Sequence, residues 1–282
     1  MKVRIDLHLH TTVSDGRSTP EDLIAEAAIA GLSTIAVTDH DTTGAWDLVS
    51  AAARARGMAC VPGIEITAVH EGRDIHVLAY FVDPGGEELT GFLVRQRTDR
   101  RRRLFLMADA LDRLGVPIDR APLDEAAAGA SGRSPGRPLL AEGLIRAGHV
   151  KNIVEAFDRY LSEGRPAFIS RDGATPQDVI ALVKRAGGLT SLAHPGKVKR
   201  DDLIPVLAAA GLDAIEVHHP DHDERSTARY RRLAKRYSLL VTGGSDYHGK
   251  GSGRTSGLGR IGLAADDFAR LVDRSGWSGA GP

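Results

Sequence analysis

The protein is poor in the residues that mark several specialised classes of protein. It has one cysteine, Cys60, among 282 residues, so no disulfide can form within the chain. A disulfide-stapled secreted scaffold is therefore excluded, and a free thiol fits a reducing compartment. No apolar run approaches the roughly 20 residues of a membrane-spanning helix, and the first residues do not resemble a signal peptide. We expect a soluble, cytoplasmic protein.

The chain also lacks an excess of charge of either sign. Lys+Arg and Asp+Glu number 37 each. The total charge therefore does not indicate a polyanionic partner or an anionic membrane, and any recognition of phosphate must be local. Hydrophobic residues make up 42% and charged residues 26%, as in an ordinary globular protein. Because no long apolar surface repeat stands out, we expect a monomer, and no obligate protein partner is predicted.

Short apolar runs alternate with helix-like segments, an order that predicts βα units. The first helix is expected after Ser18 or Thr19, with Pro20 in its first turn and Gly31 at its end. A second helix is expected over 43–57. The expected strands lie within 3–10, 33–41, 58–66, 74–83, 187–196, 212–222 and 238–249.

Residues 87–171 break this alternation and are helical in tendency. We expect them to form a helical subdomain inserted between the fourth and fifth expected strands, with 1–86 and 172–270 forming the α/β part. The chain is long enough for one large α/β barrel or for two ordinary domains. The run of arginines over 100–103 is expected to be a solvated helix face. The glycine-rich end, 271–282, is expected to be a flexible tail.

Unusual polar residues fall near the ends of these strands. His8 and His10 are two positions apart at the end of the first strand, so both imidazoles point to one face. In α/β barrels the carboxyl ends of the strands form the rim that carries the active site. Histidines mixed with carboxylates suit Zn, Mn or Fe, and this many potential ligands imply several ions. The other strand-end residues are Asp39, His40, Glu65, His194, Glu216–His219 and Asp246–His248.

Six motifs carry a resemblance to a known family. They are His8-Leu9-His10, Ser14-Asp15-Gly16, Val37-Thr38-Asp39-His40-Asp41, Pro62-Gly63-Ile64-Glu65, Ala193-His194-Pro195 and Gly244-Ser245-Asp246-Tyr247-His248. In this order they resemble the PHP (polymerase and histidinol phosphatase) family of phosphoesterases. The resemblance implies a distorted seven-stranded (β/α) barrel that holds two or three divalent metal ions, either Mn, Fe or Zn. Residues 1–86 and 172–270 would form this barrel, and the helical subdomain would cap its mouth.

The resemblance also implies which residues bind the metals. Hydrolysis of a phosphate ester by metal-activated hydroxide is the reaction that such a centre favours. Glu65 would bridge two ions and, with Asp246 and His194, would belong to the catalytic set. The first metal would be bound by His8, His10, Glu65 and Asp246, the second by Glu65, His76 and His194, and the third by Asp15, His40 and His248.

Basic residues near these motifs are candidates for binding the substrate phosphate. Arg137 in the expected insert offers a planar fork to phosphate oxygens, and Lys197, just after Ala193-His194-Pro195-Gly196, offers a point charge. Arg133 is the third candidate. Most of the basic residues in the chain are nevertheless expected on solvated surface.

The stretch around the sixth expected strand adds two candidate histidines. His219 or His222 would protonate the leaving alcohol or bind phosphate, and we favour His219 for the catalytic role. Asp39 and Asp41 flank His40, and we expect them to orient that ligand rather than to bind metal.

The substrate is less constrained than the chemistry. Within the family, the motifs most resemble those of small bacterial members that remove the 3'-phosphate of nucleoside 3',5'-bisphosphates or shorten RNA from a 5'-phosphorylated end. A cyclic phosphate, a sugar phosphate and histidinol phosphate are alternatives, because fold alone does not determine substrate. A non-catalytic metal-binding or polymerase-accessory module is an alternative of another class, and the complete ligand set counts against it.

Overall fold

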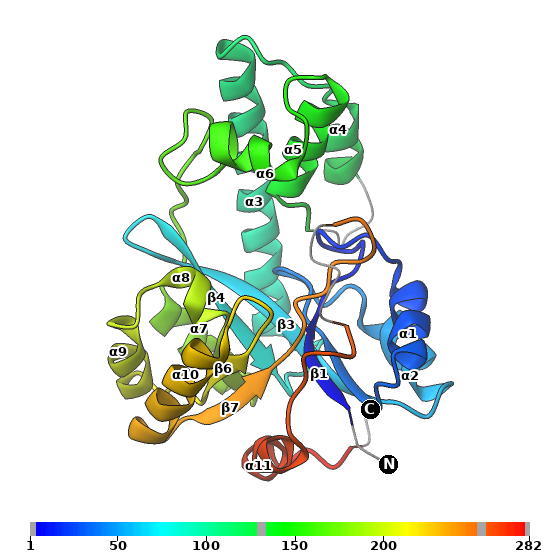
Figure 1. Cartoon of the computed structure of the whole chain (residues 1–282), viewed down its shortest axis with the longest axis vertical. Coiled ribbons are helices and arrows are strands. Elements are labelled where there is room, and N and C mark those ends of the chain that lie inside the picture. Colours follow the sequence, from blue (N-terminus) through cyan, green and yellow to red (C-terminus); the bar gives the residue numbers. More distant parts are fainter. Residues whose placement is uncertain (1–3, 129–133, 253–257, 280–282) are drawn as a thin grey trace.

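Seven strands form one sheet whose neighbours follow the order of the chain, from β1 to β7. The computed structural model describes residues 4–128, 134–252 and 258–279. Isolated bridges from Leu9 to Tyr247 and from Ile5 to Leu263 bring the region after β7 to β1, so the sheet curves into a nearly closed barrel (Figure 1). The strands are β1 (Ile5–Leu9), β2 (Thr34–Val37), β3 (Ala59–His70), β4 (Arg73–Tyr80), β5 (Leu189–Leu192), β6 (Ala214–His218) and β7 (Leu240–Gly243).

One strand departs from the expected parallel order. β1, β2 and β3 are parallel, as are β5, β6 and β7, but β4 is antiparallel to both of its neighbours. Only Glu71 and Gly72, both at positive φ, join β3 to β4. Two residues can close a hairpin but cannot make the crossover that a parallel pair needs. The prediction of βα units was therefore wrong at this one strand.

β1 shows how the sequence places polar side chains inside the barrel. Ile5, Leu7 and Leu9 belong to the hydrophobic clusters that pack against the surrounding helices. His8 alternates with them and is fully buried on the other face of the strand. The rings of His8 and His10 lie with their centroids 5.1 Å apart, which confirms that the two histidines share a face.

Helices cover the outside of the barrel (Figure 1). In the first of them, the Thr19 side chain accepts a hydrogen bond from Asp22 N and Pro20 is the first residue, as predicted. These helices bury the outer faces of the strands and leave the inner faces to the polar residues. They are α1 (Pro20–Ile29), α2 (Trp46–Arg54), α7 (Pro176–Arg185), α8 (Pro195–Val198), α9 (Leu203–Ala209), α10 (Glu224–Arg236) and α11 (Ala265–Ser275).

The end of the chain is more ordered than the sequence predicted. α11 continues to Ser275, beyond the point at which we expected a flexible tail to begin. Leu271 is fully buried, and Trp277 packs against the same cluster. Apolar residues at helical spacing outweigh the glycine-rich composition here, and the helix ends only at Gly276, where φ is 67°.

Residues 87–171 contain the helices α3 (Glu87–Arg113), α4 (Ala121–Ala128), α5 (Arg137–Arg146), α6 (Ile153–Ala156) and the π-helix η1 (Phe157–Leu161). We refer to them as the helical segment. The first half of α3 packs on the barrel, because Leu89 and Leu93 cluster with side chains of α7. The rest forms its own hydrophobic cluster around Met107, Leu111 and Leu140. α3 thus joins the barrel to the lobe seen above it in Figure 1. No helix in the described parts of the chain has the length and apolarity needed to cross a membrane.

Candidate metal centre

Glu65, in the middle of β3, lies among five buried or partly buried histidines. Its Oε2 is 3.3 Å from His8 Nε2 and 3.2 Å from His10 Nε2. Its Oε1 is 2.7 Å from His76 Nδ1 and 3.0 Å from His194 Nε2. Oε2 also lies 3.3 Å from His40 Nδ1. The two oxygens of one carboxylate therefore face two different sets of imidazole nitrogens, an arrangement that suits a ligand shared by two ions.

Asp246 lies beside the first of these pairs. Its Oδ1 is 3.4 Å from Nε2 of both His8 and His10. The close approach depends on Gly244, where a Cβ atom would lie 2.4 Å from His8 Cβ and 2.5 Å from His8 N. The glycine therefore lets the end of β7 pass directly over β1, which carries Asp246 to the two histidines.

Asp15, on the loop after β1, lies at the centre of a third group. Its Oδ1 is 3.3 Å from His248 Nε2, and its Oδ2 is 3.7 Å from His40 Nε2. The rings of His10 and His248 stack with their centroids 4.1 Å apart, and His10 Nδ1 is 3.8 Å from Asp15 Oδ1. His10 therefore faces the Glu65 and Asp246 carboxylates with Nε2 and the third group with Nδ1.

The donor set fits divalent metal ions. Ligand atoms of these residues form groups in which all atoms lie within 4.8 Å of one another. Both ring nitrogens of His10, and Nδ1 of His40 and of His194, are buried without a hydrogen-bond partner. Buried polar atoms rarely go unpaired, so imidazole nitrogens in this state fit the role of ligands to a divalent cation. The structure brings together all nine residues predicted as ligands, which are His8, His10, Asp15, His40, Glu65, His76, His194, Asp246 and His248.

The protonation states favour metal binding at part of this cluster. Burial, followed by the positive charge of Lys197, lowers the pKa of His194 to about 3. Burial also holds the pKa of His40 well below its usual value, against the attraction of nearby carboxylates. Burial raises the pKa of Glu65, but the surrounding histidines lower it further, to well below its ordinary range. Burial lowers the pKa of His8 and His10 too, but the carboxylates around them raise it more, to about 9 at His10. The neutral imidazole that binds a metal ion is therefore favoured at His194 and His40.

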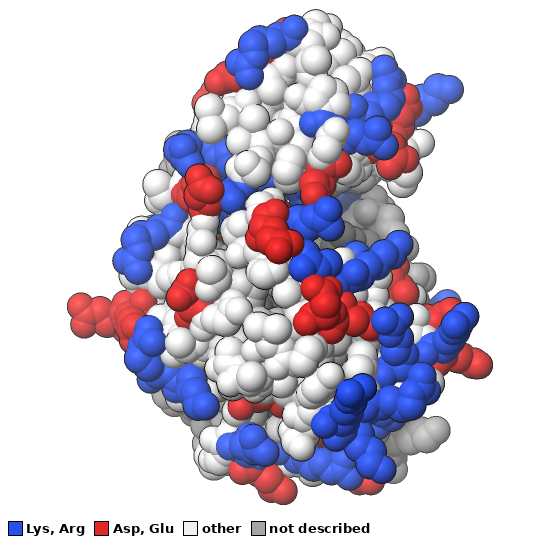
Figure 2. All heavy atoms as spheres, turned by 90° about the vertical axis from the view of Figure 1, so that its left-hand side faces the viewer, with Lys and Arg blue, Asp and Glu red and all other residues white. Residues whose placement is uncertain are grey.

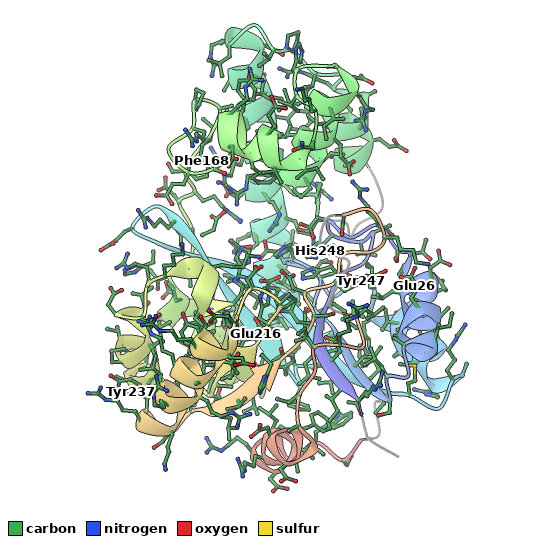
Figure 3. All side chains as sticks on the ribbon, viewed as in Figure 1. Glu26, Phe168, Glu216, Tyr237, Tyr247 and His248 are labelled. Carbon is green, nitrogen blue, oxygen red and sulfur yellow. The ribbon has the colours of Figure 1, made fainter. Side chains whose placement is uncertain are left out.

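Glu216, on β6, is a residue that the sequence did not single out for a role. Its side chain is fully buried. His8 donates a hydrogen bond from Nδ1 to Glu216 Oε1 over 2.9 Å, and the backbone N–H of His194 donates to Oε2 over 2.7 Å. Burial raises the pKa of Glu216, but His8 lowers it more strongly, to about 2. One ionised carboxylate therefore orients two of the candidate ligands. Glu216 is labelled in Figure 3, inside the barrel.

Asp39 and Asp41 act differently from the prediction that they orient His40. Asp39 accepts hydrogen bonds from the backbone N–H and the hydroxyl of Thr11, over 2.8 and 2.6 Å. Asp41 accepts a hydrogen bond from Arg100 Nη1 over 2.6 Å. The first carboxylate therefore holds the loop that follows β1, and the second holds a basic side chain of α3.

The two candidate histidines after β6 do not reach the open part of the site. His222 donates from Nδ1 to the carbonyl of Val217 and accepts at Nε2 from the backbone N–H of Gly196, so both ring nitrogens are occupied. His222 is a structural residue, contrary to the prediction that it binds substrate. His219 is also buried, with Nε2 3.3 Å from Asp246 Oδ2. Its position suits orientation of Asp246 rather than proton transfer to a leaving group.

A cavity of about 280 Å³ opens above the metal-binding cluster. One wall carries candidate ligands from the barrel, and the other carries Arg100, Arg103, Leu104 and Phe157 from the helical segment. Of the three basic residues predicted to bind phosphate, Arg137 and Lys197 line this cavity. Arg133 lies outside the described residues.

Two arginines that line the cavity were predicted to be exposed to solvent. The side chain of Arg102 is 68% exposed, as predicted for the run 100–103, but those of Arg100 and Arg103 are 12% and 7% exposed. A spacing of three residues puts Arg100 and Arg103 on one face of α3, which was the signal available in the sequence. Arg171, from the strand-like connection that leads to α7, lines the same wall.

Comparison with known proteins agrees with this geometry. The model of the PHP domain matches residues 6–130. A 5'-3' exoribonuclease of Haemophilus influenzae is 33% identical over 254 residues, covering 88% of this chain and 91% of that protein. A 3',5'-nucleoside bisphosphate phosphatase of Chromobacterium violaceum is 31% identical and covers 88% of each chain. A phosphoribosyl 1,2-cyclic phosphate 1,2-diphosphodiesterase of Eggerthella lenta is 34% identical, covering 87% of this chain and 94% of that protein.

A solved structure supports the same relationship. A protein of Bifidobacterium adolescentis, described as a candidate metal-dependent phosphoesterase, superimposes with a TM-score of 0.87 and 34% sequence identity. The match covers 96% of both chains. Its extent includes the barrel and the helical segment alike. The chain therefore belongs to the PHP family, and it is a metal-dependent phosphoesterase.

Proposed function

We propose that this enzyme acts on nucleotides that carry a second phosphate. It removes the 3'-phosphate of nucleoside 3',5'-bisphosphates or releases nucleotides from short 5'-phosphorylated RNA. The observation that carries this proposal is the basic wall of the cavity, which faces the candidate metal ligands and is made of Arg100, Arg103, Arg137, Arg171 and Lys197. A substrate with a single phosphate, placed at the metal centre, would make no phosphate contact with this wall.

The charges of this wall are arranged to accept an anion. Asp74 pairs with Arg103 over 3.1 Å and lies 3.5 Å from Arg137, so one carboxylate faces two guanidinium groups. The side chain of Arg137 is 27% exposed and that of Lys197 is 31% exposed, which leaves both accessible from the cavity. A guanidinium fork and an ammonium point charge are common partners of phosphate oxygens.

We further propose that all nine candidate ligands bind metal and that the helical segment caps the barrel mouth. One ion would be bound by His8, His10, Glu65 and Asp246. A second ion would be bound by His76, His194 and also Glu65, which would therefore be a ligand of both ions. Asp15, His40 and His248 would bind a third. The bound ions, which we expect to be Mn, Fe or Zn, would supply Lewis acidity and an activated water for hydrolysis of the ester.

The protein's own side chains do the remaining work of positioning. Glu216 holds His8 with Nε2 directed at the centre, because its carboxylate accepts a hydrogen bond from Nδ1–H. His219 Nε2 lies 3.3 Å from Asp246 Oδ2 and helps to hold that carboxylate in place. Lys197 Nζ, 3.4 Å from Asp246 Oδ2, stands between the ligands and the cavity, where it would neutralise phosphate charge. We also propose that the enzyme is cytoplasmic, because its single cysteine fits a reducing compartment.

The proposal is tested by phosphate release from adenosine 3',5'-bisphosphate, 5'-AMP and a short 5'-phosphorylated RNA, using metal-reconstituted protein. We expect the bisphosphate to yield 5'-AMP that is not degraded further, or the RNA to be shortened to mononucleotides. Equal turnover of the bisphosphate and 5'-AMP would contradict the role of the second phosphate. So would the lack of turnover of both bisphosphate and RNA by protein shown to hold metal.

The ligand assignment has its own test. Glu65→Ala should abolish hydrolysis, because Glu65 faces both sets of histidines, whereas Glu88→Ala, on the exposed surface of α3, should leave it unchanged. Unaltered turnover by purified Glu65→Ala protein would refute the shared ligand.

Hydrolysis of a cyclic phosphate is the second candidate function. It is favoured by the 34% identity to the cyclic phosphate diesterase of Eggerthella lenta. A cyclic diester of a sugar phosphate belongs in the same assay as a fourth substrate. If the protein hydrolysed that substrate and none of the other three, hydrolysis of a cyclic phosphate would replace the nucleotide proposal.

A further inference from the structure

A second cavity continues from the one above the metal centre. Its volume is about 380 Å³. It lies between the beginning of β4, the connection from η1 to α7, and α8, and its lining includes Arg73, Glu163, Phe168 and Lys199. Phe168 is labelled in Figure 3, where the helical segment meets the barrel. Four residues line both cavities, namely Asp74, Arg137, Lys197 and Val198.

The part of the second cavity that the first does not share carries basic groups of its own. Lys199 is exposed at the end of α8, and within the described ranges it has no ion-pair partner. Arg73 Nε lies 2.9 Å from Glu163 Oε1, but both side chains are about half exposed. Such a pair in water holds its partners weakly, so Arg73 remains available to another anion. Figure 2 shows this face, where Lys and Arg mix with Asp and Glu at the waist between the two lobes.

An aromatic ring separates this basic rim from the wall of the first cavity. The guanidinium carbon of Arg103 lies 4.9 Å from the centroid of Phe168, and that of Arg137 lies 5.7 Å from it. Cation–π contacts of this kind hold the ring in place. Ile75 and Val198 add apolar surface to the same cavity. Basic side chains along an aromatic and apolar surface are the combination that binds single-stranded nucleic acid.

We propose that the second cavity binds the nucleotide chain of single-stranded RNA beyond the residue whose phosphate ester lies at the metal centre. The inference rests on the proposed function and extends it to the oligonucleotide. Arg73 and Lys199 contact backbone phosphates, and the surface of Phe168 faces a sugar or base. A single nucleoside bisphosphate is held within the first cavity and does not reach Arg73 or Lys199. The two substrates therefore depend on different sets of basic residues.

The test compares kcat/KM for a 5'-phosphorylated pentaribonucleotide and for adenosine 3',5'-bisphosphate across a range of KCl concentrations. The enzymes are the wild type, Lys199→Gln, and the double variant Arg73→Gln/Lys199→Gln. For single strands, each phosphate contact contributes about 0.7 to the slope of log affinity against log salt. We expect the RNA slope to decrease in magnitude by about 0.7 in the single variant and about 1.4 in the double variant. At each KCl concentration, kcat/KM for the bisphosphate should be the same in the wild type and in both variants.

Lys235→Gln serves as the matched control, because Lys235 is an exposed basic residue on α10 outside both cavities. It should change neither substrate, and thermal unfolding should confirm that all variants are folded. RNA slopes unchanged in the double variant, or an equal loss for both substrates, would overturn the inference. Turnover of the bisphosphate without shortening of RNA by the wild type would overturn the inference and leave the proposed function intact. Turnover of neither substrate would overturn both.

Discussion

Replacement of Glu216 by Gln gives the sharpest test of how the metal centre is held. The carboxylate accepts two buried hydrogen bonds, one from His8 Nδ1 and one from the backbone of His194. Gln has the same shape but replaces one acceptor oxygen with a donor NH₂ group. One of the two donors then faces another donor, in a place that water does not reach.

The size of the effect follows from these contacts. A hydrogen bond to a charged group contributes about 1.5 to 3 kcal/mol, so Glu216→Gln should lower the free energy of unfolding of the metal-free protein by about that amount. Glu216→Ala removes both acceptors and should cost about 3 to 6 kcal/mol. Without the carboxylate, the proton of His8 is free to move to Nε2, the nitrogen that faces Glu65 and Asp246. Metal affinity should therefore fall about 10-fold to 100-fold in Glu216→Gln.

The measurement is competition between the protein and a chromophoric chelator for Mn²⁺ or Zn²⁺, together with unfolding in the presence of EDTA. Glu88→Gln makes the same chemical change on the exposed surface of α3, and it should alter neither quantity. Wild-type metal affinity in a folded Glu216→Gln protein would refute the positioning role. A loss of stability without a loss of affinity would assign Glu216 to the fold alone.

Two further predictions concern packing and pH. Gly244→Ala should destabilise the protein by about 1 to 3 kcal/mol or more and weaken metal binding, because the new methyl group meets His8. Gly91→Ala, inside α3 where a Cβ atom would meet only Arg95 Nη1 at an ordinary contact distance of 3.9 Å, should be neutral or stabilising in the same thermal unfolding assay. Burial raises the pKa of Asp74, but Arg103, Arg137 and Arg171 lower it more, to about 2. This contribution to stability, about 2 kcal/mol, is present above pH 4 and is lost as the pH falls towards 2, so denaturant unfolding should show the gap between wild type and Asp74→Asn shrinking below pH 4.

The strands and the candidate ligands could be predicted because their signals are local. His8 and His10 are two positions apart in a strand, which predicts that they share a face. A run of apolar residues before Asp246 marks the end of another strand. Side chains at the carboxyl ends of neighbouring parallel strands converge, so a list of strand ends becomes a site. His76 reaches the same site from the middle of the antiparallel β4 rather than from a strand end.

The misjudged residues depend on partners distant in the sequence. Glu216 becomes important only because β6 faces His8 of β1 across the barrel interior. His222 is occupied by two backbone groups whose proximity no sequence pattern reveals. Arg103 is buried because Asp74 and the carbonyl of Ile169 meet it on the barrel side. In each case the decisive contact is made by the tertiary structure.

The unbroken helix α3 separates two tasks that many enzymes combine in the same loops. All nine candidate metal ligands come from outside residues 87–171, whereas α3 and α5 carry Arg100, Arg103 and Arg137 to the opposite wall. Substitutions in the helical segment can therefore change which ester fits without moving a ligand. An ancestor with this architecture could exchange substrates by altering one wall, while the hydrolytic machinery passed unchanged to its descendants.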